Sequence, residues 1–529
     1  MKRNVNLKKS FMLGASLFVL SFAVACSNGD SQQETNVDSN ASLEAENVTD
    51  GETDEITEIS LAIWNADQAL SGDEVLDTIE SKLNINITPV NVTWDDYSQK
   101  LQLWASSGSL PDVFAGALRD SFTYPQWIDQ GVVKEIPENL DVYPTLNEYL
   151  SGQAAQESKL NGKLYCIPRQ TYPSQEWSVI DRVVVYRWDL AQQAGITEEP
   201  KNWSEFNTMM EAIINEDSLG TSITGMTSGG RDLPYGAIMP YGMAINANKW
   251  VMDDDGLYKP AYFVEDVVAG FQLARDMYTS GIIENDIALV TGTSGIEKFL
   301  QGKSAAITLA AGFGGTYESL GRYWEDIYGR NYLDDVRALD LMPDVNGNPA
   351  YATTSIAWSE SYISSAVDDN KLNKILELYD YLLTDDGSFL SNYGPEGELY
   401  EMVDGKAVLT DPSIIIKDVY PSTEALGVLA RWNPSTYDDR FVLPTPTEYI
   451  EIDLNRVEQG KNVVLPEYNQ RCTELVSELG IEFTISYFDD FFTIMTGTEP
   501  VEDMWNDMLD KYEDDGLSDV IKQVNDALY

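Results

Sequence analysis

Residues 58–115 read EISLAIWNADQALSGDEVLDTIESKLNINITPVNVTWDDYSQKLQLWASSGSLPDVFA, and this stretch decides the fold. Short aliphatic runs alternate in it with segments whose apolar residues recur at helical spacing. The predicted strands are Glu58–Trp64, Asn84–Val92 and Leu110–Ala115, and the predicted helices are Asp73–Leu83 and Trp94–Ser107. Strands that alternate with helices predict βαβ units around a parallel sheet, where the loops at the strand carboxyl ends face a common crevice.

The same alternation continues toward the C terminus and predicts an α/β fold for the folded part of the chain. Strands or extended segments are predicted at Val179–Tyr186, Ser304–Leu309 and Tyr351–Ser365. Helices are predicted at Trp188–Ala194, Trp203–Asn215, Phe263–Ser280 and Lys371–Leu383. The C-terminal third is more helical, and Val501–Leu528 alternates acidic and apolar positions.

Composition excludes several classes of protein. The 529 residues include 34 Lys and Arg, 87 Asp and Glu and no His, for a formal net charge of −53. Without His there is no Ser-His-Asp triad, no Cys-His pair and no His-ligated zinc or haem. The negative charge leaves no electrostatic basis for binding nucleic acid. With 43% apolar and 11% aromatic residues, the chain is nevertheless rich enough in core formers to fold.

The N terminus predicts secretion and a lipid anchor. Residues 1–25 combine a basic start with an apolar stretch too short to span a bilayer, as in a secretory signal peptide. The sequence Ala-Val-Ala-Cys that ends at Cys26 resembles a bacterial lipobox, which makes Cys26 the predicted lipidation site; a plain secretory signal is the alternative. Residues 26–58 are acidic, lack aromatic residues and predict a disordered tether. We therefore expect an extracellular protein, lipid-anchored to the cell membrane of a Gram-positive type of bacterium.

Motifs that could bind a metal or a phosphate are rejected by their spacing. Asp253–Gly256 and Asp344–Asn348 begin like calcium loops, but Val264 and Ser355 stand where the loop needs a glutamate. Asp253–Gly256 is interpreted as a hairpin turn. Gly312–Gly315 is not followed by the Gly-Lys-Ser/Thr of a phosphate loop. We predict no cofactor and no catalytic metal, and leave a structural calcium open.

The cysteines of the folded part are Cys166 and Cys472, without a Cys-x-x-Cys motif. Two free, buried thiols are favoured, and a disulfide in an extracellular compartment stays open.

Several segments, in order along the chain, resemble the extracellular solute-binding proteins (family 1) of carbohydrate ABC transporters. They include LPDVF at Leu110–Phe114, NGKLYCIP at Asn161–Pro168, the stretch Val184–Phe206 and FLQGKSAA at Phe299–Ala306. YGPEG at Tyr393–Gly397 and MTG at Met495–Gly497 resemble the longer, LplA-like branch of that family.

The resemblance implies a two-lobed fold of the periplasmic-binding-protein type (type II), with a ligand cleft between the lobes and a hinge of two or three crossing segments. Lobe 1 is expected to hold residues 59–175 and 351–395, and lobe 2 residues 176–350 and 396–529. The implied partners are an oligosaccharide and a membrane permease, and the protein is expected to be a monomer.

Sugars present C–H faces that stack on aromatic rings and hydroxyls that suit planar polar groups. We therefore searched loops at strand ends for aromatic and polar side chains together. The candidate ligand-binding residues are Trp64, Asn65, Asp67, Arg119, Arg169, Trp177, Asp232, Tyr235, Phe313, Trp358, Glu360 and Trp432. Each aromatic residue in this set could instead belong to the core, as expected for Trp104 and Trp188, and Arg187 is expected to form a structural ion pair.

The favoured function is that of a non-enzymatic substrate-binding lipoprotein of an ABC importer. A cell-surface glycoside hydrolase or lyase that uses a carboxylate pair stays open, because such an enzyme needs no His. A ligand sensor that does not take part in transport is a third hypothesis.

Overall fold

The computed structural model describes residues 56–529, except for positions 95, 120, 122, 229–231, 234–235, 237, 243–246, 265, 353–355, 433, 435–437 and 465. The predicted signal peptide, Cys26 and almost all of the tether therefore lie outside the described residues. None of the helices in the described ranges is long and apolar enough to cross a membrane.

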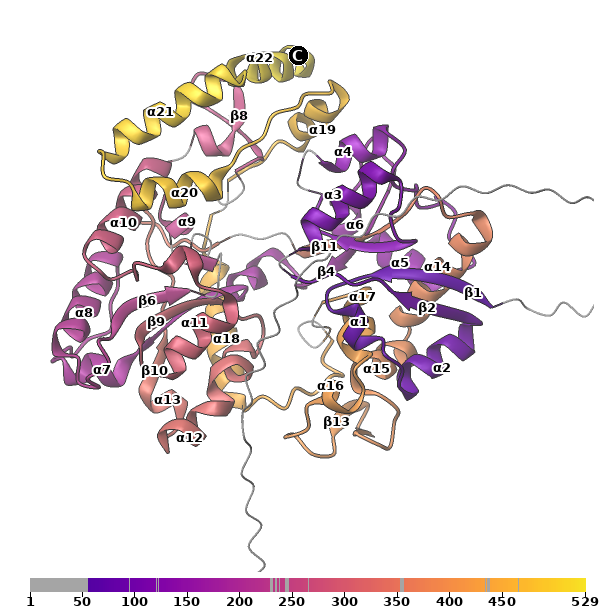
Figure 1. The fold of residues 1–529 in the computed structure, drawn as a ribbon, viewed down its shortest axis with the longest axis horizontal. Helices are drawn as coiled ribbons and strands as arrows, with labels where there is room; N and C mark the ends of the chain where they lie inside the picture. Colours follow the sequence, from indigo (N-terminus) through magenta and orange to yellow (C-terminus); the bar gives the residue numbers. More distant parts are fainter. Residues whose placement is uncertain are drawn as a thin grey trace, which may run out of the picture. The chain divides into compact units, whose positions relative to one another are not determined.

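The first sheet has the strand order β2-β1-β3-β11-β4 (Figure 1). Its strands are β1 (Thr57–Ala62), β2 (Ile85–Pro89), β3 (Val113–Gly116), β4 (Ile167–Gln170) and β11 (Ala357–Ile363). Strand β1 is parallel to β2 and β3, as the alternation in residues 58–115 predicts. Strand β11 is antiparallel to β3 and β4, so a segment that returns late in the sequence completes this sheet.

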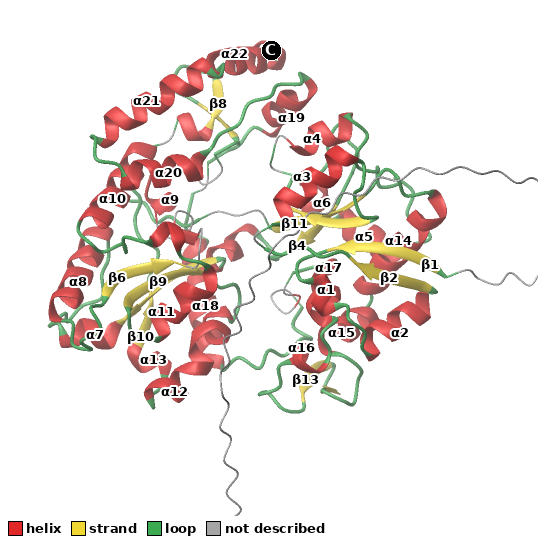
Figure 2. Ribbon diagram, in the orientation of Figure 1, coloured by secondary structure: helices red, strands yellow, loops and turns green. Residues whose placement is uncertain are grey.

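Helices cover both faces of the first sheet (Figure 2). The helices of this lobe are α1 (Ala66–Ala69), α2 (Glu74–Leu83), α3 (Tyr97–Ser107), α4 (Thr123–Asp129), α5 (Pro144–Ser151), α6 (Gln153–Glu157), α14 (Asp369–Leu383), α15 (Asp385–Tyr393), α16 (Ile416–Val419) and α17 (Thr423–Leu429). Of these, α15 packs on α14 and α17, and α16 packs on α17. Helix α2 begins where the sequence predicts, because the Asp73 carboxylate accepts a hydrogen bond from Leu76 N at 3.0 Å.

The second sheet has the order β10-β5-β9-β6, with β5 (Arg182–Arg187), β6 (Thr224–Ser228), β9 (Ser304–Ala310) and β10 (Val336–Ala338). Strand β5 is antiparallel to β9 and β10, and β6 is parallel to β9. The helices around this sheet are α7 (Trp188–Gln193), α8 (Trp203–Glu216), α9 (Met239–Gly242), α10 (Val267–Thr279), α11 (Gly292–Leu300), α12 (Arg322–Tyr328), α13 (Tyr332–Asp335), α18 (Thr447–Gly460), α19 (Gln470–Glu478), α20 (Tyr487–Thr496), α21 (Val501–Asp514) and α22 (Leu517–Leu528).

Two hairpins lie outside these sheets: β7 (Trp250–Met252) with β8 (Tyr258–Pro260), and β12 (Tyr400–Val403) with β13 (Lys406–Leu409). The turn between β7 and β8 confirms the interpretation of Asp253–Gly256. Lys259 forms ion pairs with Asp253 and Asp255 there, at 2.5 and 2.7 Å. Among the described residues, no group of three or more His, Cys, Asp and Glu side chains could hold a metal ion.

The predicted helix Phe263–Ser280 is wrong at its start. Residues Ala261–Phe263 form a separate 3-10 turn, and α10 begins at Val267. Tyr262 is fully buried and donates a hydrogen bond to Asp490 at 3.0 Å, so it is fixed against the C-terminal helices. Periodicity alone does not reveal this tertiary contact.

Each sheet has its own hydrophobic core. One core packs strands β1 to β4 against α2, α5, α14 and α17, and the other packs the second sheet against α8, α10 and α20 to α22. Tyr420, Leu426 and Leu429 belong to the first core, although the sequence assigns residues 396–529 to the second lobe. Helix α17 contacts α1 and α15, so its apolar face closes the first core (Figure 1).

The chain passes from one sheet to the other three times, after β4, after β10 and after α17. The first of these connecting segments includes a 3-10 helix, η1 (Gln175–Ile180), which packs on α18. Cys166 and Cys472 are free and buried, which confirms the interpretation as two thiols. Burial raises the pKa of Cys472 to about 11.

Candidate functional site

Four tryptophans meet at the edge of the first sheet where β1 and β2 end and the antiparallel strand β11 begins. Trp64 follows β1, Trp94 follows β2, Trp358 lies in β11 and Trp432 follows α17. The rings of Trp64 and Trp94 are parallel and their centroids are 4.4 Å apart. Trp358 and Trp432 lie 5.4 and 5.7 Å from Trp64. We call these four residues the tryptophan cluster.

The backbone at the end of β1 sets the position of Trp64. Asn65 has a φ of 59°, a left-handed conformation that asparagine tolerates better than most residues, and it turns the chain directly into α1. Its N–H donates to Val92 O at 2.9 Å, which ties the loop after β1 to the loop after β2. Parallel neighbouring strands therefore bring Trp64 and Trp94 together at the same sheet edge.

The cluster has a buried base and an exposed face. Trp64 is 3% exposed, whereas Trp94 is 49% and Trp358 is 37% exposed. Trp432 is half-buried, and its Nε1 donates to Trp358 O at 2.9 Å. Trp358 N in turn donates to Thr171 Oγ1 at 3.1 Å. The outer rings are thus held by hydrogen bonds and stacking while their faces stay in contact with solvent.

Arg169 lies behind the cluster. Its guanidinium carbon is 5.5 Å from the centre of the Trp64 ring, and its nitrogens donate to Ser359 Oγ, Ser361 Oγ and Leu429 O at 2.7–3.0 Å. The side chain is fully buried, and burial lowers the pKa of the guanidinium. The sequence predicts direct ligand contact for Arg169, but in this structure its donors are used within the protein.

Glu360 is likewise buried, at 3% exposure. Its carboxylate accepts hydrogen bonds from Leu118 N at 3.1 Å and from Tyr362 Oη at 2.7 Å, and a longer one from Arg119 N at 3.4 Å. It therefore fixes the loop that follows β3. The half-buried Arg119 directs Nη1 toward Ser158 Oγ at 3.5 Å. Arg169 and Glu360 are positioned to support the predicted site from behind.

A cavity of about 350 Å³ opens beside the cluster. It is lined by Trp64, Asn65, Trp94, Ile416, Lys417, Thr423, Glu424, Val428 and Trp432. Lys417 and Glu424 form an exposed ion pair at 3.5 Å, so the lining carries balanced charge. Trp64 Nε1 is buried and has no hydrogen-bond partner among the described residues, which leaves one donor at the base of the cavity.

The remaining candidates lie elsewhere. Asp67 is exposed near the cluster and accepts a hydrogen bond from Asn91 Nδ2 at 2.7 Å. Trp177 and Phe313 contact each other edge to face at 5.6 Å, next to the segments that connect the two sheets. Asp232 pairs with Arg182 at 2.9 Å. Burial raises the pKa of Asp232, and the Arg182 guanidinium opposes this shift. Tyr235 lies outside the described residues.

Sequence reasoning missed Trp94 and the helical wall of the cavity. Trp94 follows a predicted strand and precedes two acidic residues, so the rule that selected Trp64 could have selected it. Assigning Trp94 to the following helix hid this signal, whereas α3 begins only at Tyr97. Ile416, Lys417 and Glu424 carry no local signal, because only tertiary packing brings α16 and α17 to the first sheet.

Comparisons with known proteins bear on this site. The sequence model of the family "Bacterial extracellular solute-binding protein" matches residues 74–393. "Lipoprotein LipO" of Bacillus subtilis (strain 168) is 21% identical over 334 residues, which are 60% of this chain and 62% of LipO. The match thus covers less than two thirds of that relative's length.

Two solved structures are similar over nearly the whole chain. The alginate-binding protein AlgQ2, solved without calcium ion, has a TM-score of 0.69 at 17% identity, and the match covers 90% of this chain and 98% of AlgQ2. The substrate-binding protein FusA of S. pneumoniae, solved in complex with kestose, has a TM-score of 0.65 at 17% identity, covering 89% of this chain and 98% of FusA. At such identities the likeness shows the fold, and it confirms the predicted two-lobed α/β architecture of binding proteins.

Proposed function

Because the chain belongs to the family of bacterial extracellular solute-binding proteins, we propose that it captures an oligosaccharide outside the cell and delivers it to the permease of an ABC importer. The tryptophan cluster is the observation that supports this proposal most directly. Its outer rings, Trp94 and Trp358, offer apolar faces fixed in place, which suits the C–H faces of sugar rings.

The polar groups around the cavity suit sugar hydroxyls. The Trp64 indole N–H is a donor without a partner among the described residues, Asn65 offers a planar amide, and Lys417 and Glu424 offer a donor and an acceptor at the rim. Their charges balance, so the site favours a neutral glycan over a strongly charged one. AlgQ2 and FusA are carbohydrate-binding proteins by name or by bound ligand, which supports a glycan as the ligand, and the kestose bound to FusA is a neutral one.

Ligand capture would act through an equilibrium between open and closed arrangements of the two lobes. A ligand that contacts both lobes binds the closed form better and shifts the population toward it. Trp177 and Phe313 lie beside the connecting segments, where such a motion would change their contact. The permease would recognise the closed form, and the protein itself would perform no chemistry.

The chain would be attached to the outer face of the membrane through lipid on Cys26. The lipobox-like sequence before Cys26 and the similarity to LipO support this part of the proposal. Cys26→Ser should release the protein into the medium and remove the mass of the lipid from the mature chain. Retention of the variant in the membrane fraction would contradict lipid anchoring.

Titration with a panel of neutral oligosaccharides, followed by calorimetry and tryptophan fluorescence, tests the central claim. We expect saturable binding of at least one glycan, which is recovered intact. Trp358→Ala should weaken that binding at least tenfold, or about 1.4 kcal/mol. A matched control is Tyr323→Ala, which removes an equally exposed aromatic ring from α12 and should leave affinity unchanged. Cleavage of the glycan would favour a hydrolase or lyase and would overturn the proposal.

A further inference from the structure

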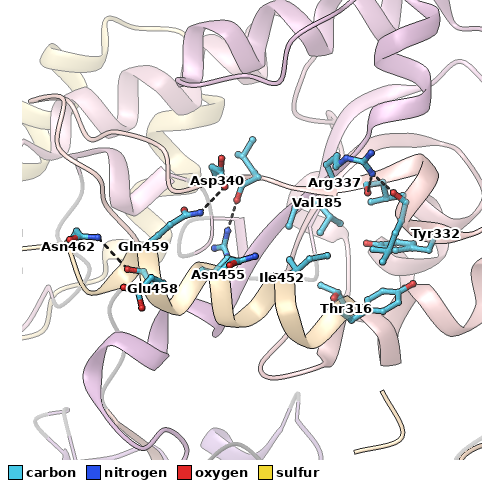
Figure 3. A pocket seen from close by; sticks show the side chains of 16 residues that line it. Val185, Thr316, Tyr332, Arg337, Asp340, Ile452, Asn455, Glu458, Gln459 and Asn462 are labelled. Atoms are coloured by element: carbon cyan, nitrogen blue, oxygen red, sulfur yellow. Dashed lines mark hydrogen bonds between the residues drawn. The ribbon is translucent and has the colours of Figure 1, made fainter. Parts of the chain in front are cut away.

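A groove of about 660 Å³ lies beside the edge strand of the second sheet, between β10 and α18 (Figure 3). It shares no lining residue with the cavity beside the tryptophan cluster. Its volume falls within the usual range for small-molecule sites, about 300–1,000 Å³. The groove is therefore large enough for a ligand of its own.

One wall of the groove is a single face of α18. Ile452, Asn455, Gln459 and Asn462 follow one another at intervals of three or four residues, so they line up along one side of the helix and its C-terminal turn (Figure 3). Asn455 is exposed. The wall thus presents a row of planar amide groups, which can donate and accept hydrogen bonds at the same time.

The opposite wall comes from β10 and the segment after it. Val336 and Ala338 of β10, with Val185 of the neighbouring strand β5, supply its apolar part. Arg337 and Asp340 supply charge (Figure 3). The two walls are joined at one end, where the Gln459 amide donates to Asp340 Oδ1 at 3.0 Å and accepts from Leu341 N at 3.3 Å. This connection gives the groove a fixed width there.

Two buried polar groups on the groove lack a partner among the described residues: Tyr332 Oη and Arg456 Nε. Their side chains are 4% and 7% exposed. The other nitrogens of Arg456 donate to backbone carbonyl oxygens, including that of Leu339, so this guanidinium is held in place with one donor left over. Buried polar groups in folded proteins are nearly always paired, so two unpaired groups beside one groove need an explanation, and an occupant of the groove would supply one.

We propose that this groove is a second binding site and that its ligand is a short neutral glycan. Two arginines and two acids line it, Arg337 and Arg456 with Asp340 and Glu458, so its charges balance and disfavour an ionic ligand. A glycan hydroxyl can exchange hydrogen bonds with the exposed Asn455 amide, and ligand entry would uncover Tyr332 Oη and Arg456 Nε, which are buried in this structure, so that they too can pair with it. The ring C–H faces would contact Leu333, Ala338 and Ile452, which are half-buried lining residues. This inference does not depend on the function proposed for the tryptophan cluster.

The test weakens binding at the tryptophan cluster and then asks whether changes in the groove alter the binding that remains. The full-length protein with Trp94→Ala and Trp358→Ala is titrated with maltotriose, cellotriose, mannotriose and kestose up to about 10 mM, in the affinity range of weak sites. We expect saturable binding of at least one of these probes with a stoichiometry of one. Tyr332→Phe keeps the ring and removes the unpaired hydroxyl, and should weaken that binding about tenfold. Asn455→Ala, at an exposed position, should weaken it about threefold.

Tyr317→Phe is the matched control, because Tyr317 packs on Tyr449 at 5.1 Å but does not line the groove. It should leave the affinity unchanged. The inference would be overturned if the Trp94→Ala, Trp358→Ala protein showed no saturable binding. It would also be overturned if neither Tyr332→Phe nor Asn455→Ala altered the binding. Loss of glycan uptake by cells carrying Tyr332→Phe, without any glycan bound in the groove, would identify a protein partner instead and would also overturn it. If the groove binds a glycan in the Trp94→Ala, Trp358→Ala protein, and the intact tryptophan cluster binds none, the inference about the groove stands and the proposed function is wrong.

Discussion

Each lobe contains a buried arginine packed against a tryptophan, and the two pairs behave differently. Arg169 lies 5.5 Å from the Trp64 ring in the first lobe, and Arg187 lies 5.0 Å from the Trp324 ring in the second. Both guanidinium groups are fully buried. Arg187 forms a bidentate ion pair with Asp189, with two nitrogen–oxygen distances of 2.8 Å, and the sequence predicts such an ion pair. Arg169 instead donates hydrogen bonds to hydroxyls and a backbone carbonyl.

The surroundings of the two rings differ even more. Trp324 is completely buried, and its Nε1 donates to Asp335 at 2.9 Å. Trp64 is buried too, but its Nε1 has no partner in the described part of the chain, and exposed rings stack on it. An arginine beside a tryptophan is therefore no sign of a binding site by itself. Exposed neighbouring rings and an unused donor mark the site in the first lobe, and complete pairing marks a structural core in the second.

The largest expected effect comes from breaking the pair in the second lobe. Asp189→Ala leaves Arg187 buried without its carboxylate and should lower the free energy of unfolding by about 3–5 kcal/mol. Calorimetric melting should show this loss. Lys522→Ala breaks an exposed ion pair on α22 and should leave the melting temperature almost unchanged. If the Asp189→Ala variant and the wild type had the same melting temperature, the pair of Arg187 with Asp189 would have no structural role.

Removing the exposed rings of the first lobe should affect binding and leave folding largely intact. Trp94→Ala combined with Trp358→Ala should weaken glycan binding by about 2–3 kcal/mol, or roughly 30–150-fold, because two stacking faces are lost. The melting temperature should change little, since both rings are partly exposed. Isothermal calorimetry and thermal melting measure the two effects. A large loss of stability with unchanged affinity would make this cluster structural, like the one around Trp324.

A pH effect should belong to the second lobe, where Asp453 is buried close to Tyr332 and Tyr449. Burial raises the pKa of Asp453 to about 6 from an ordinary value of 3.8. The folded state then binds more protons than the unfolded state between about pH 4 and pH 6, so the contribution of this group to stability falls as the pH rises through that window. The Asp453→Asn side chain cannot ionise. The free energy of unfolding of this variant, relative to that of the wild type, should therefore rise by about 2 kcal/mol between pH 4 and pH 7.

Thermal melting at both pH values measures this gain. Glu458→Gln, an exposed substitution on the same helix, is the control and should differ from wild type by less than about 0.5 kcal/mol at each pH. A stability difference for Asp453→Asn that does not depend on pH would contradict the burial argument.

The smallest effect is expected at the turn that positions Trp64. Asn65 has a φ of 59°, in the left-handed region, where asparagine is tolerated because its polar side chain can form local hydrogen bonds. Alanine lacks such a side chain, so Asn65→Ala should lower the free energy of unfolding by about 1 kcal/mol. Asn65→Gly should be close to neutral, because glycine adopts this conformation without steric cost. Melting of the two variants compares them directly. If alanine were tolerated as well as glycine, strain at this turn would not explain the position of Trp64.

Much of the first lobe was predictable from local sequence. The strand and helix alternation of residues 58–115 predicts the parallel pairs of β1 with β2 and β3. Trp64 is a candidate because it follows a predicted strand, Trp358 because it lies near a predicted crossover, and Trp432 because it lies in a Pro-flanked loop. Burial was not predictable for Arg169 and Glu360. Arg169 donates to Leu429 O across 260 positions and Glu360 accepts from Leu118 N across 242, so no local pattern records either contact.

The sequence by itself determined the α/β class, the signal-like N terminus, the acidic character of the chain and the strand-end loops that carry aromatic residues. These properties follow from composition and from the periodicity of apolar residues, which are local. The tertiary structure decided which lobe holds α16 and α17, which tryptophans stack, and which arginines are used internally. Those outcomes depend on packing between segments that are hundreds of residues apart in the sequence, and local sequence patterns do not show which distant segments contact each other.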